Sequence, residues 1–139
     1  MIHYLLDSSG LWRLLREEKL GEAWLETTTL QAIGSCAAQR AEFRRSARNV
    51  AEFEAMGEMF TDLYPDVPVP KRVWDWVGAA QYALAEKGVL GAAGPLDLLI
   101  CATAAHHGLI VLHDDTDFVT AARVLPDVSE RNVRDAPGL

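Results

Sequence analysis

Apolar runs alternate with amphipathic stretches along the chain, which is the pattern of a parallel α/β protein. Short apolar runs at 2–6 and 109–112 predict buried strands, and the β-branched run at 27–33 predicts a third. The segment 66–69, bracketed by prolines, is expected as an edge strand or an extended linker, and 128–133 as a further edge strand. Because strands that alternate with helices pair in parallel, these runs are expected to form one parallel sheet.

Helices are predicted between the strands by apolar residues at helical spacing. Ser8-Ser9, Ser35 and Asn49 are suitable N-caps, and Pro95 suits the first turn of a helix. The small, flexible segment 88–94 predicts a loop. The expected helices cover 11–15, 20–26, 36–47, the stretch from Asn49 to Leu63, 73–85, 96–107 and 118–125.

Size and charge narrow the possible functions. The chain of 139 residues, half of them hydrophobic, is expected to form a single domain over 1–139. A net charge of −7 argues against broad electrostatic binding to nucleic acid, which usually needs a basic face. A bound cation that neutralises site carboxylates would change that balance, and a basic protein partner would suit such a surface.

The cysteines and the apolar runs indicate a cellular location. Cys36 and Cys101 lie in apolar helical patterns and are expected as buried, reduced thiols of a cytoplasmic protein. No signal peptide is expected, because residues 1–10 have no basic segment and Asp7 interrupts them. No membrane partner is expected either, since the longest apolar run, 98–105, is far too short for a span.

Acidic residues stand where the ends of parallel strands would gather them. Asp7 directly follows the first strand, Asp115 and Asp117 follow the strand at 109–112, and Asp97 lies in the first turn of the helix that Pro95 opens. Sites in parallel sheets form at the carboxyl ends of the strands. Clustered carboxylates repel one another unless a cation intervenes, and hard oxygen ligands are what Mg²⁺ or Mn²⁺ selects. The pattern therefore indicates metal-dependent phosphodiester chemistry.

Each of these acids also has an ordinary structural explanation. Asp7 could cap a helix, and an acid such as Asp97 in a first turn complements the helix dipole. At least one of the aspartates in 114–117 is expected to be structural, as the cap of the next helix. Glu42 lies in an arginine-rich helix, where pairing with Arg45 or Arg48 would account for it.

Four segments together resemble the PIN-domain ribonucleases, and in particular VapC-type toxins of toxin–antitoxin modules. They occur in the order and spacing of that family and span nearly the whole chain. The segments are Leu6–Leu15, Arg40–Phe43 with Ser46–Asn49, Asp97–Ala104 and Leu112–Phe118. Two departures stand out: the loop 88–94 lacks a basic residue found in many relatives, and Phe43-Arg44-Arg45 replaces an apolar pair after the glutamate.

The resemblance implies a three-layer α/β/α PIN-like domain with a central parallel sheet of four or five strands. It also implies an Mg²⁺-dependent ribonuclease, with Mn²⁺ as a possible substitute, that acts as the toxin of a toxin–antitoxin pair and forms a homodimer. The cognate antitoxin and an RNA substrate would be its partners. By motif position the catalytic acids are Asp7, Glu42, Asp97 and Asp115, the metal ligands are Asp7, Asp97 and Asp115, and Asp117 and Ser9 support them.

Substrate binding would need positive charge near the acids. Arg13, Arg40, Arg44 and Arg45 are the candidate RNA contacts, although solvated helix faces would explain them equally well. The alternative function is a partner-binding module with little nuclease activity of its own, silenced or scaffolded by an antitoxin. A receiver or phosphatase domain fits less well, because such folds need a lysine after a late strand, whereas Lys71 and Lys87 lie in or near helices.

Overall fold

A four-stranded parallel sheet forms the centre of the protein, whose computed structural model describes residues 1–136. The strand order is β2–β1–β3–β4, so the first strand lies in the interior, between the second and the third. All three strand pairs are parallel, as the alternating pattern predicted. The strands are β1 (Tyr4–Leu6), β2 (Ile33–Gly34), β3 (Ile110–His113) and β4 (Ser129–Asn132).

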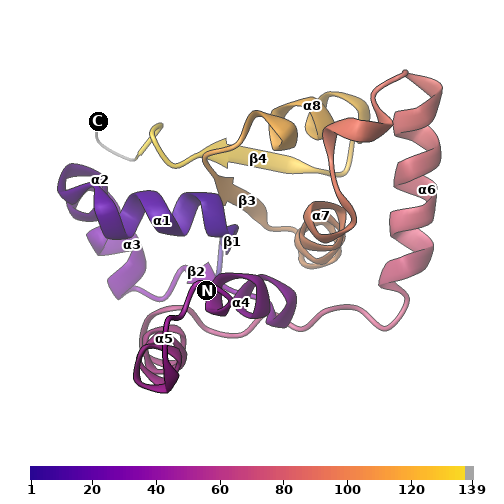
Figure 1. Ribbon diagram of the computed structural model, residues 1–139. Helices are drawn as coiled ribbons and strands as arrows, with labels where there is room; N and C mark the ends of the chain where they lie inside the picture. The colour runs from indigo at the N-terminus through magenta and orange to yellow at the C-terminus, as the bar shows by residue number, and fades with distance from the viewer. Residues whose placement is uncertain (137–139) are drawn as a thin grey trace.

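Helices cover both faces of the sheet (Figure 1). Neighbouring residues of a strand point to opposite faces, and each face has its own apolar core. Leu5 and Val111 pack into one core with residues of α6 (Val73–Glu86), α7 (Pro95–His107) and α8 (Thr116–Val124). Leu6 and Leu112 pack into the other core with residues of α1 (Ser8–Arg16), α2 (Glu18–Ala23) and α5 (Val50–Leu63). The arrangement is the three-layer α/β/α architecture.

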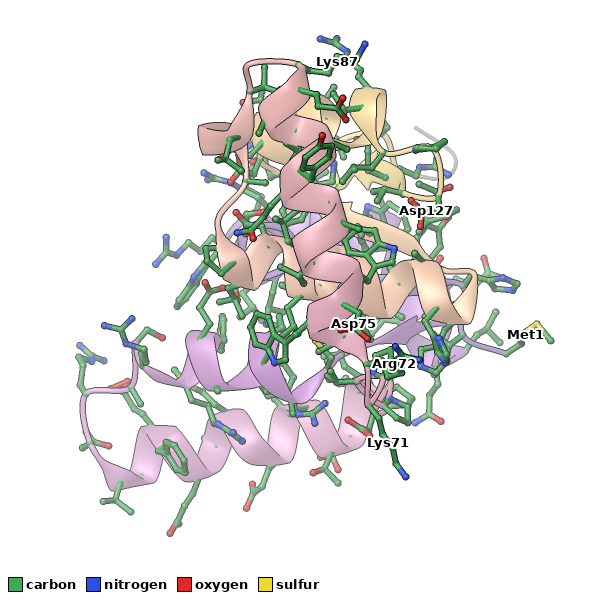
Figure 2. All side chains as sticks on the ribbon, turned by 90° about the vertical axis from the view of Figure 1, so that its right-hand side faces the viewer. Met1, Lys71, Arg72, Asp75, Lys87 and Asp127 are labelled. Atoms are coloured by element: carbon green, nitrogen blue, oxygen red, sulfur yellow. The ribbon has the colours of Figure 1, made fainter. Side chains whose placement is uncertain are left out.

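The helices follow the order expected from the sequence, but two short helices, α2 and α3 (Leu25–Thr29), lie where one was predicted at 20–26. A 3-10 turn, Leu90–Ala92, interrupts the segment predicted as a loop. Figure 2 shows α6 lying along one side of the molecule, with Arg72 and Asp75 near its N-terminal end and Lys87 at its C-terminal end. The helices are α1 (Ser8–Arg16), α2 (Glu18–Ala23), α3 (Leu25–Thr29), α4 (Ala37–Arg44), α5 (Val50–Leu63), α6 (Val73–Glu86), α7 (Pro95–His107) and α8 (Thr116–Val124).

The predicted strand at 27–33 is wrong over most of its length. Residues 25–29 form α3, and strand β2 contains only Ile33 and Gly34. The threonines are accommodated in the helix because the Thr28 hydroxyl donates a hydrogen bond to the Trp24 carbonyl one turn earlier. The fully buried Trp24 anchors this region, and Gln31 ends it with a left-handed φ of 56°.

Smaller expectations were also corrected. The segment 66–69 forms no strand, only a single parallel bridge between Ser35 and Asp66. Cys36, not Ser35, is the N-cap residue of α4, because the Ser35 hydroxyl donates to the Tyr64 carbonyl instead. Asn49 caps α5 as predicted, with its side chain accepting a hydrogen bond from the Glu52 amide.

The cysteines are buried as expected from the sequence. Cys36 and Cys101 are buried and form no disulfide. None of the helices within residues 1–136 is both long and apolar enough to cross a membrane.

Candidate active site at the carboxyl edge of the sheet

Four carboxylates from four separate segments line one cavity of about 330 Å³. Asp7 follows β1 and caps α1, and Asp115 follows β3 and caps α8. Asp97 lies in the first turn of α7, and Glu42 lies on α4. The remaining lining residues are Ser8, Ser9, Trp12, Phe43 and Ser46. The structure therefore brings together acids that lie far apart in the sequence, with 108 positions between Asp7 and Asp115 (115 − 7).

Asp7 is almost fully buried, with 5% of its surface exposed. Burial raises the pKa of its carboxyl group, and two hydrogen bonds from Ser9 oppose that rise. The Ser9 amide and the Ser9 hydroxyl both donate to Asp7 Oδ2, at 2.9 and 2.5 Å. These bonds fix one oxygen of the carboxylate at the start of α1.

Burial and neighbouring negative charge both act on the Asp97 carboxyl group. Burial, followed by repulsion from Asp7, raises the pKa of Asp97 to about 6, and Asp115 and Glu42 add to the repulsion. The hydrogen bond from the Gly94 amide to Asp97 Oδ2, at 3.3 Å, only partly opposes this. Burial and the neighbouring acids together therefore disfavour the charged form of Asp97.

The three aspartates of the β3–α8 loop separate into different environments. Asp115 lines the cavity, and its Oδ1 accepts the Asp117 amide at 2.9 Å, as a helix cap does. Asp117 lies in the first turn of α8 and is not among the residues that line the cavity within the described chain. Asp114 is structural, because Arg13, Asn132 and Arg134 all donate to its carboxylate. Despite the opposing effect of burial, these donors hold the pKa of Asp114 below its ordinary value.

Ser9 connects two of the acidic segments. Its hydroxyl donates to Asp7 and accepts the Asp114 amide at 2.9 Å, so it joins the loop after β1 to the loop after β3. Ser9 is therefore bonded directly to Asp7, and its supporting role in catalysis stays a prediction.

The predicted RNA-contacting arginines lie in different surroundings. Arg13 pairs with Asp114 and Glu17, and Arg40 donates to Ser35 and Asp66. Arg44 lies over the Phe53 ring and lines a separate hollow of about 350 Å³ between α4 and α5. Among residues 1–136, Arg45 has no ion-pair partner, and it lies at the end of α4 beside Ser46 of the acidic cavity.

The four carboxylates are the kind of ligand that a hard divalent cation prefers, but they are not arranged around one point. No basic side chain within residues 1–136 forms a salt bridge with Asp7, Glu42, Asp97 or Asp115. In the same part of the chain, no three Asp, Glu, His or Cys side chains are arranged to hold a metal ion. The cavity thus supplies uncompensated oxygen ligands that would have to converge by side-chain rotation to share one ion.

Two buried polar residues beside the cavity were not singled out from the sequence. Gln39 is fully buried and donates to the Ser8 hydroxyl, whereas its Oε1 has no partner within the described residues. Its position three residues before Glu42, on the same helical face, was the signal that could have found it. His113, the last residue of β3, is also fully buried, and both of its ring nitrogens are hydrogen-bonded.

A larger hollow, of about 440 Å³, lies away from these acids between α6 and α7. Ala102, Ala105 and Trp76 form much of its wall, and Asp127 is the one carboxylate among its lining residues in the described chain. Asp127 lies beside α6 in Figure 2, and its Oδ2 accepts a hydrogen bond from the Trp76 indole at 2.7 Å. This hollow lacks the clustered acids that the chemistry requires.

Comparison with known proteins identifies the family. The family model for the PIN domain matches residues 4–124. The chain belongs to the PIN-domain family. This PIN domain is 58% identical over 106 residues to a protein named Ribonuclease VapC6 from Mycobacterium tuberculosis, a match that covers 76% of the chain and 84% of the relative. It is 33% identical over 127 residues to Ribonuclease VapC21 from the same species, covering 87% of each.

Solved structures share the fold of this PIN domain at lower sequence identity. A crystal structure of DNA-bound VapBC from Salmonella typhimurium has a TM-score of 0.75 at 16% identity, covering 96% of this chain and 99% of that one. FitAcB from Neisseria gonorrhoeae has a TM-score of 0.70 at 23% identity, covering 95% and 99%. The three-layer PIN fold is therefore confirmed over nearly the whole chain.

Proposed function

We propose that this PIN domain is an Mg²⁺-dependent endoribonuclease and the toxin of a toxin–antitoxin pair. The observation that carries the proposal is the single cavity lined by Asp7, Glu42, Asp97 and Asp115. Its support from outside the chain is 58% identity to a protein whose name is ribonuclease.

Three carboxylates are proposed to hold the metal ion: Asp7, Asp97 and Asp115. They fit the ion because they are oxygen donors that line one cavity and because no basic side chain in residues 1–136 forms an ion pair with them. A bound Mg²⁺ supplies charge neutralisation at the phosphoryl oxygen and acidifies water, which are the usual contributions of a divalent ion to phosphodiester hydrolysis. Mn²⁺ is expected to substitute.

The residues of the chain have distinct proposed tasks around that ion. Glu42, which is not in the metal set, accepts the proton of the attacking water. Ser9 holds Asp7 in one orientation through its amide and its hydroxyl. Arg45, at the end of the Glu42 helix, contacts the RNA phosphates next to the cut. Water attacks the phosphodiester directly in this proposal, so no covalent enzyme intermediate forms.

Proteins are also proposed as partners. A cognate antitoxin is supported by the VapBC complexes among the structural neighbours and by the net charge of −7, which favours a basic partner. A homodimer is supported by the exposed aromatic residues of α6, where Trp74 and Tyr82 are 61% and 69% exposed. The buried, unlinked thiols support the cytoplasm as the location.

The test is cleavage of total RNA by the purified, antitoxin-free protein with Mg²⁺ or Mn²⁺, beside the same reaction in EDTA. We expect cuts at discrete sites with metal, none in EDTA, and none with Asp7→Asn. The matched control is Asp62→Asn, an exposed aspartate on α5 whose loss leaves the cavity unchanged.

The outcome also separates the nuclease from its alternative. Absence of cleavage by folded, metal-bound protein across several RNA pools would contradict the nuclease proposal. Retained high-affinity binding of an antitoxin under those conditions would then identify a partner-binding module.

A further inference from the structure

We propose that His113 is a positioning residue that aligns Asp115 through a hydrogen bond to its backbone, and that Glu130 holds His113 in place. The inference rests on the proposed function, because it concerns Asp115 as a candidate metal ligand. It adds a task for two side chains outside the acidic cavity.

Both ring nitrogens of His113 are engaged although the side chain is fully buried. Nδ1 accepts the backbone amide of Asp115 at 3.0 Å, and Nε2 lies 2.7 Å from Glu130 Oε1. The ring also packs against Phe118, with centroids 5.1 Å apart and an angle of 36° between the planes. The imidazole is therefore fixed by two hydrogen bonds and one aromatic contact.

The donor of each bond determines where the proton lies. A backbone amide can only donate, so Nδ1 must be the unprotonated nitrogen. The proton is then on Nε2, which donates to the Glu130 carboxylate. A ring turned by 180° would place carbon atoms against both partners, so only one orientation satisfies the surroundings. Glu130 selects that orientation from the adjacent strand β4.

The orientation of the His113 ring also affects where the Asp115 carboxylate lies. The loop after β3 is held by three hydrogen bonds of its backbone amides: the Asp114 amide to Ser9, the Asp115 amide to His113, and the Asp117 amide to Asp115. Since Asp115 uses Oδ1 to cap α8, its Oδ2 is the oxygen left for a ligand in the cavity. Where Oδ2 points is decided by the backbone that His113 holds.

A purely structural role would not require a histidine. An apolar side chain fills a buried strand position without the cost of burying two polar nitrogens. Here that cost is met by bonds that end at Asp115 and at Glu130. Partners that orient metal ligands in this way typically change metal affinity or activity by about 10- to 100-fold when removed.

Two substitutions separate the two bonds of the ring. His113→Asn keeps an acceptor near the position of Nδ1, since an Asn side chain commonly accepts the amide two residues later. His113→Gln places its amide near Nε2 and keeps only the bond to Glu130. His113→Leu removes both bonds. His106→Gln, at an exposed histidine of α7, is the matched control.

The first measurement is Mn²⁺ binding without RNA, followed by kcat and KM for RNA cleavage. We expect His113→Gln and His113→Leu to lose about 10- to 100-fold in Mn²⁺ affinity and in kcat with KM unchanged. His113→Asn should recover most of that loss. Thermal unfolding of each variant shows whether the folded fraction accounts for the change.

Other results would overturn the inference. If folded His113→Asn is as impaired as His113→Leu, or if all variants match the wild type, His113 does not position Asp115. If the wild type neither binds Mn²⁺ nor cleaves RNA, the proposed function fails instead. The positioning is then decided by NMR: a proton on Nδ1, or an Asp115 amide that exchanges equally fast in wild type and His113→Leu, would reject it.

Discussion

The carboxyl group of Asp97 has a raised pKa, so its protonation is coupled to folding. Its pKa is raised to about 6 by burial and by Asp7, whereas its own hydrogen bond to Gly94 is a long one of 3.3 Å. The folded state therefore binds the Asp97 proton more tightly than the unfolded chain does. The resulting stabilisation is fully present below the ordinary value of 3.8 and is lost as the pH rises through about 6.

Substitution of Asp97 should remove this pH dependence. In the metal-free protein, Asp97→Asn is expected to raise the free energy of unfolding by on the order of 1 kcal/mol near neutral pH, after allowance for partial exposure. Near the ordinary carboxylate pKa the two proteins should be equally stable. Urea unfolding across this pH range measures the difference, and Mg²⁺ should stabilise the wild type more than the variant. Parallel pH profiles for the two proteins would contradict the expectation.

Arg40 of α4 and Arg45 at its C-terminal end differ in the contacts that their side chains make. Arg40 donates to the Ser35 carbonyl at 2.8 Å and to Asp66 at 2.7 Å. Arg45, which directly follows the helix, has no ion-pair partner among residues 1–136. One is therefore expected to act in folding and the other in substrate binding.

Alanine substitutions should separate these roles. Arg45→Ala is expected to raise KM for RNA several-fold and to leave the unfolding midpoint unchanged. Arg40→Ala should instead cost about 1–3 kcal/mol of stability, because it removes charge-assisted hydrogen bonds to the Ser35 carbonyl, the Ser35 hydroxyl and Asp66. Steady-state cleavage and urea unfolding measure the two effects. A stability loss confined to Arg45→Ala would reverse the assignment.

At the scale of elements, the close approach of α1 to β3 sets the geometry of the acidic cavity. A Cβ on Gly10 would lie 2.9 Å from the Leu112 carbonyl oxygen and 3.2 Å from the His113 Cα. Both neighbours are backbone atoms that cannot rotate away. Only glycine allows the helix capped by Asp7 to lie against the strand that leads to Asp115.

Gly10→Ala is therefore expected to destabilise the protein by about 1–3 kcal/mol, as overpacking of a core does. The control is Gly78→Ala in the exposed middle of α6, where nothing lies within 4 Å of the added Cβ. That variant should gain about 0.4–1 kcal/mol from the reduced entropy of the unfolded chain. Chemical denaturation compares them, and equal shifts would show that the α1–β3 contact is not limiting.

The elements predicted from the sequence succeeded where a local pattern sufficed. The apolar runs that end at Leu6 and Leu112 gave interior strands, and Asn49 gave a cap, because burial and capping are read from neighbouring residues. The run at 27–33 misled because β-branched residues there sit on a short helix anchored by Trp24. That anchor is a hydrogen bond to Val133, 109 positions away, which no local window contains.

The candidate site was predictable to a similar extent. Each acid follows a strand or opens a helix, except Glu42, whose place among the four came from the family resemblance alone. The pairing of Arg13 with Asp114 and the role of Glu130 beside His113 could not be predicted. Both depend on how distant segments meet around β3, and the sequence pattern does not give the strand order.

At the scale of the whole molecule, the region around β4 is tied to the first helices. The buried Trp24 indole donates to the Val133 carbonyl at 2.7 Å, and the Trp24 ring meets Tyr4 edge to face at 5.3 Å. Arg134 forms ion pairs with Glu17 and Asp114. These contacts close the chain, because they hold residues 133–134 against the segments on either side of α2.

Trp24→Phe tests this closure. The variant keeps most of the packing against Tyr4 but leaves the Val133 carbonyl without its donor, which is expected to cost about 1–3 kcal/mol. Trp74→Phe, at a tryptophan that is 61% exposed, should change stability by less than about 0.5 kcal/mol. Thermal unfolding of both variants provides the comparison. Equal midpoints would show that the Trp24 bond contributes little to the closure.

The contacts of β4 with the loop after β3 also impose an order in time. A ribosome adds Asp7, Glu42, Asp97 and Asp115 before it adds Glu130, Asn132 and Arg134, whose side chains hold His113 and Asp114. A nascent chain therefore carries all four acids of the cavity before it carries the side chains that hold the loop after β3. Under the proposed function, a chain that stops before Glu130 is therefore expected to be impaired in metal binding and RNA cleavage although it contains all four acids.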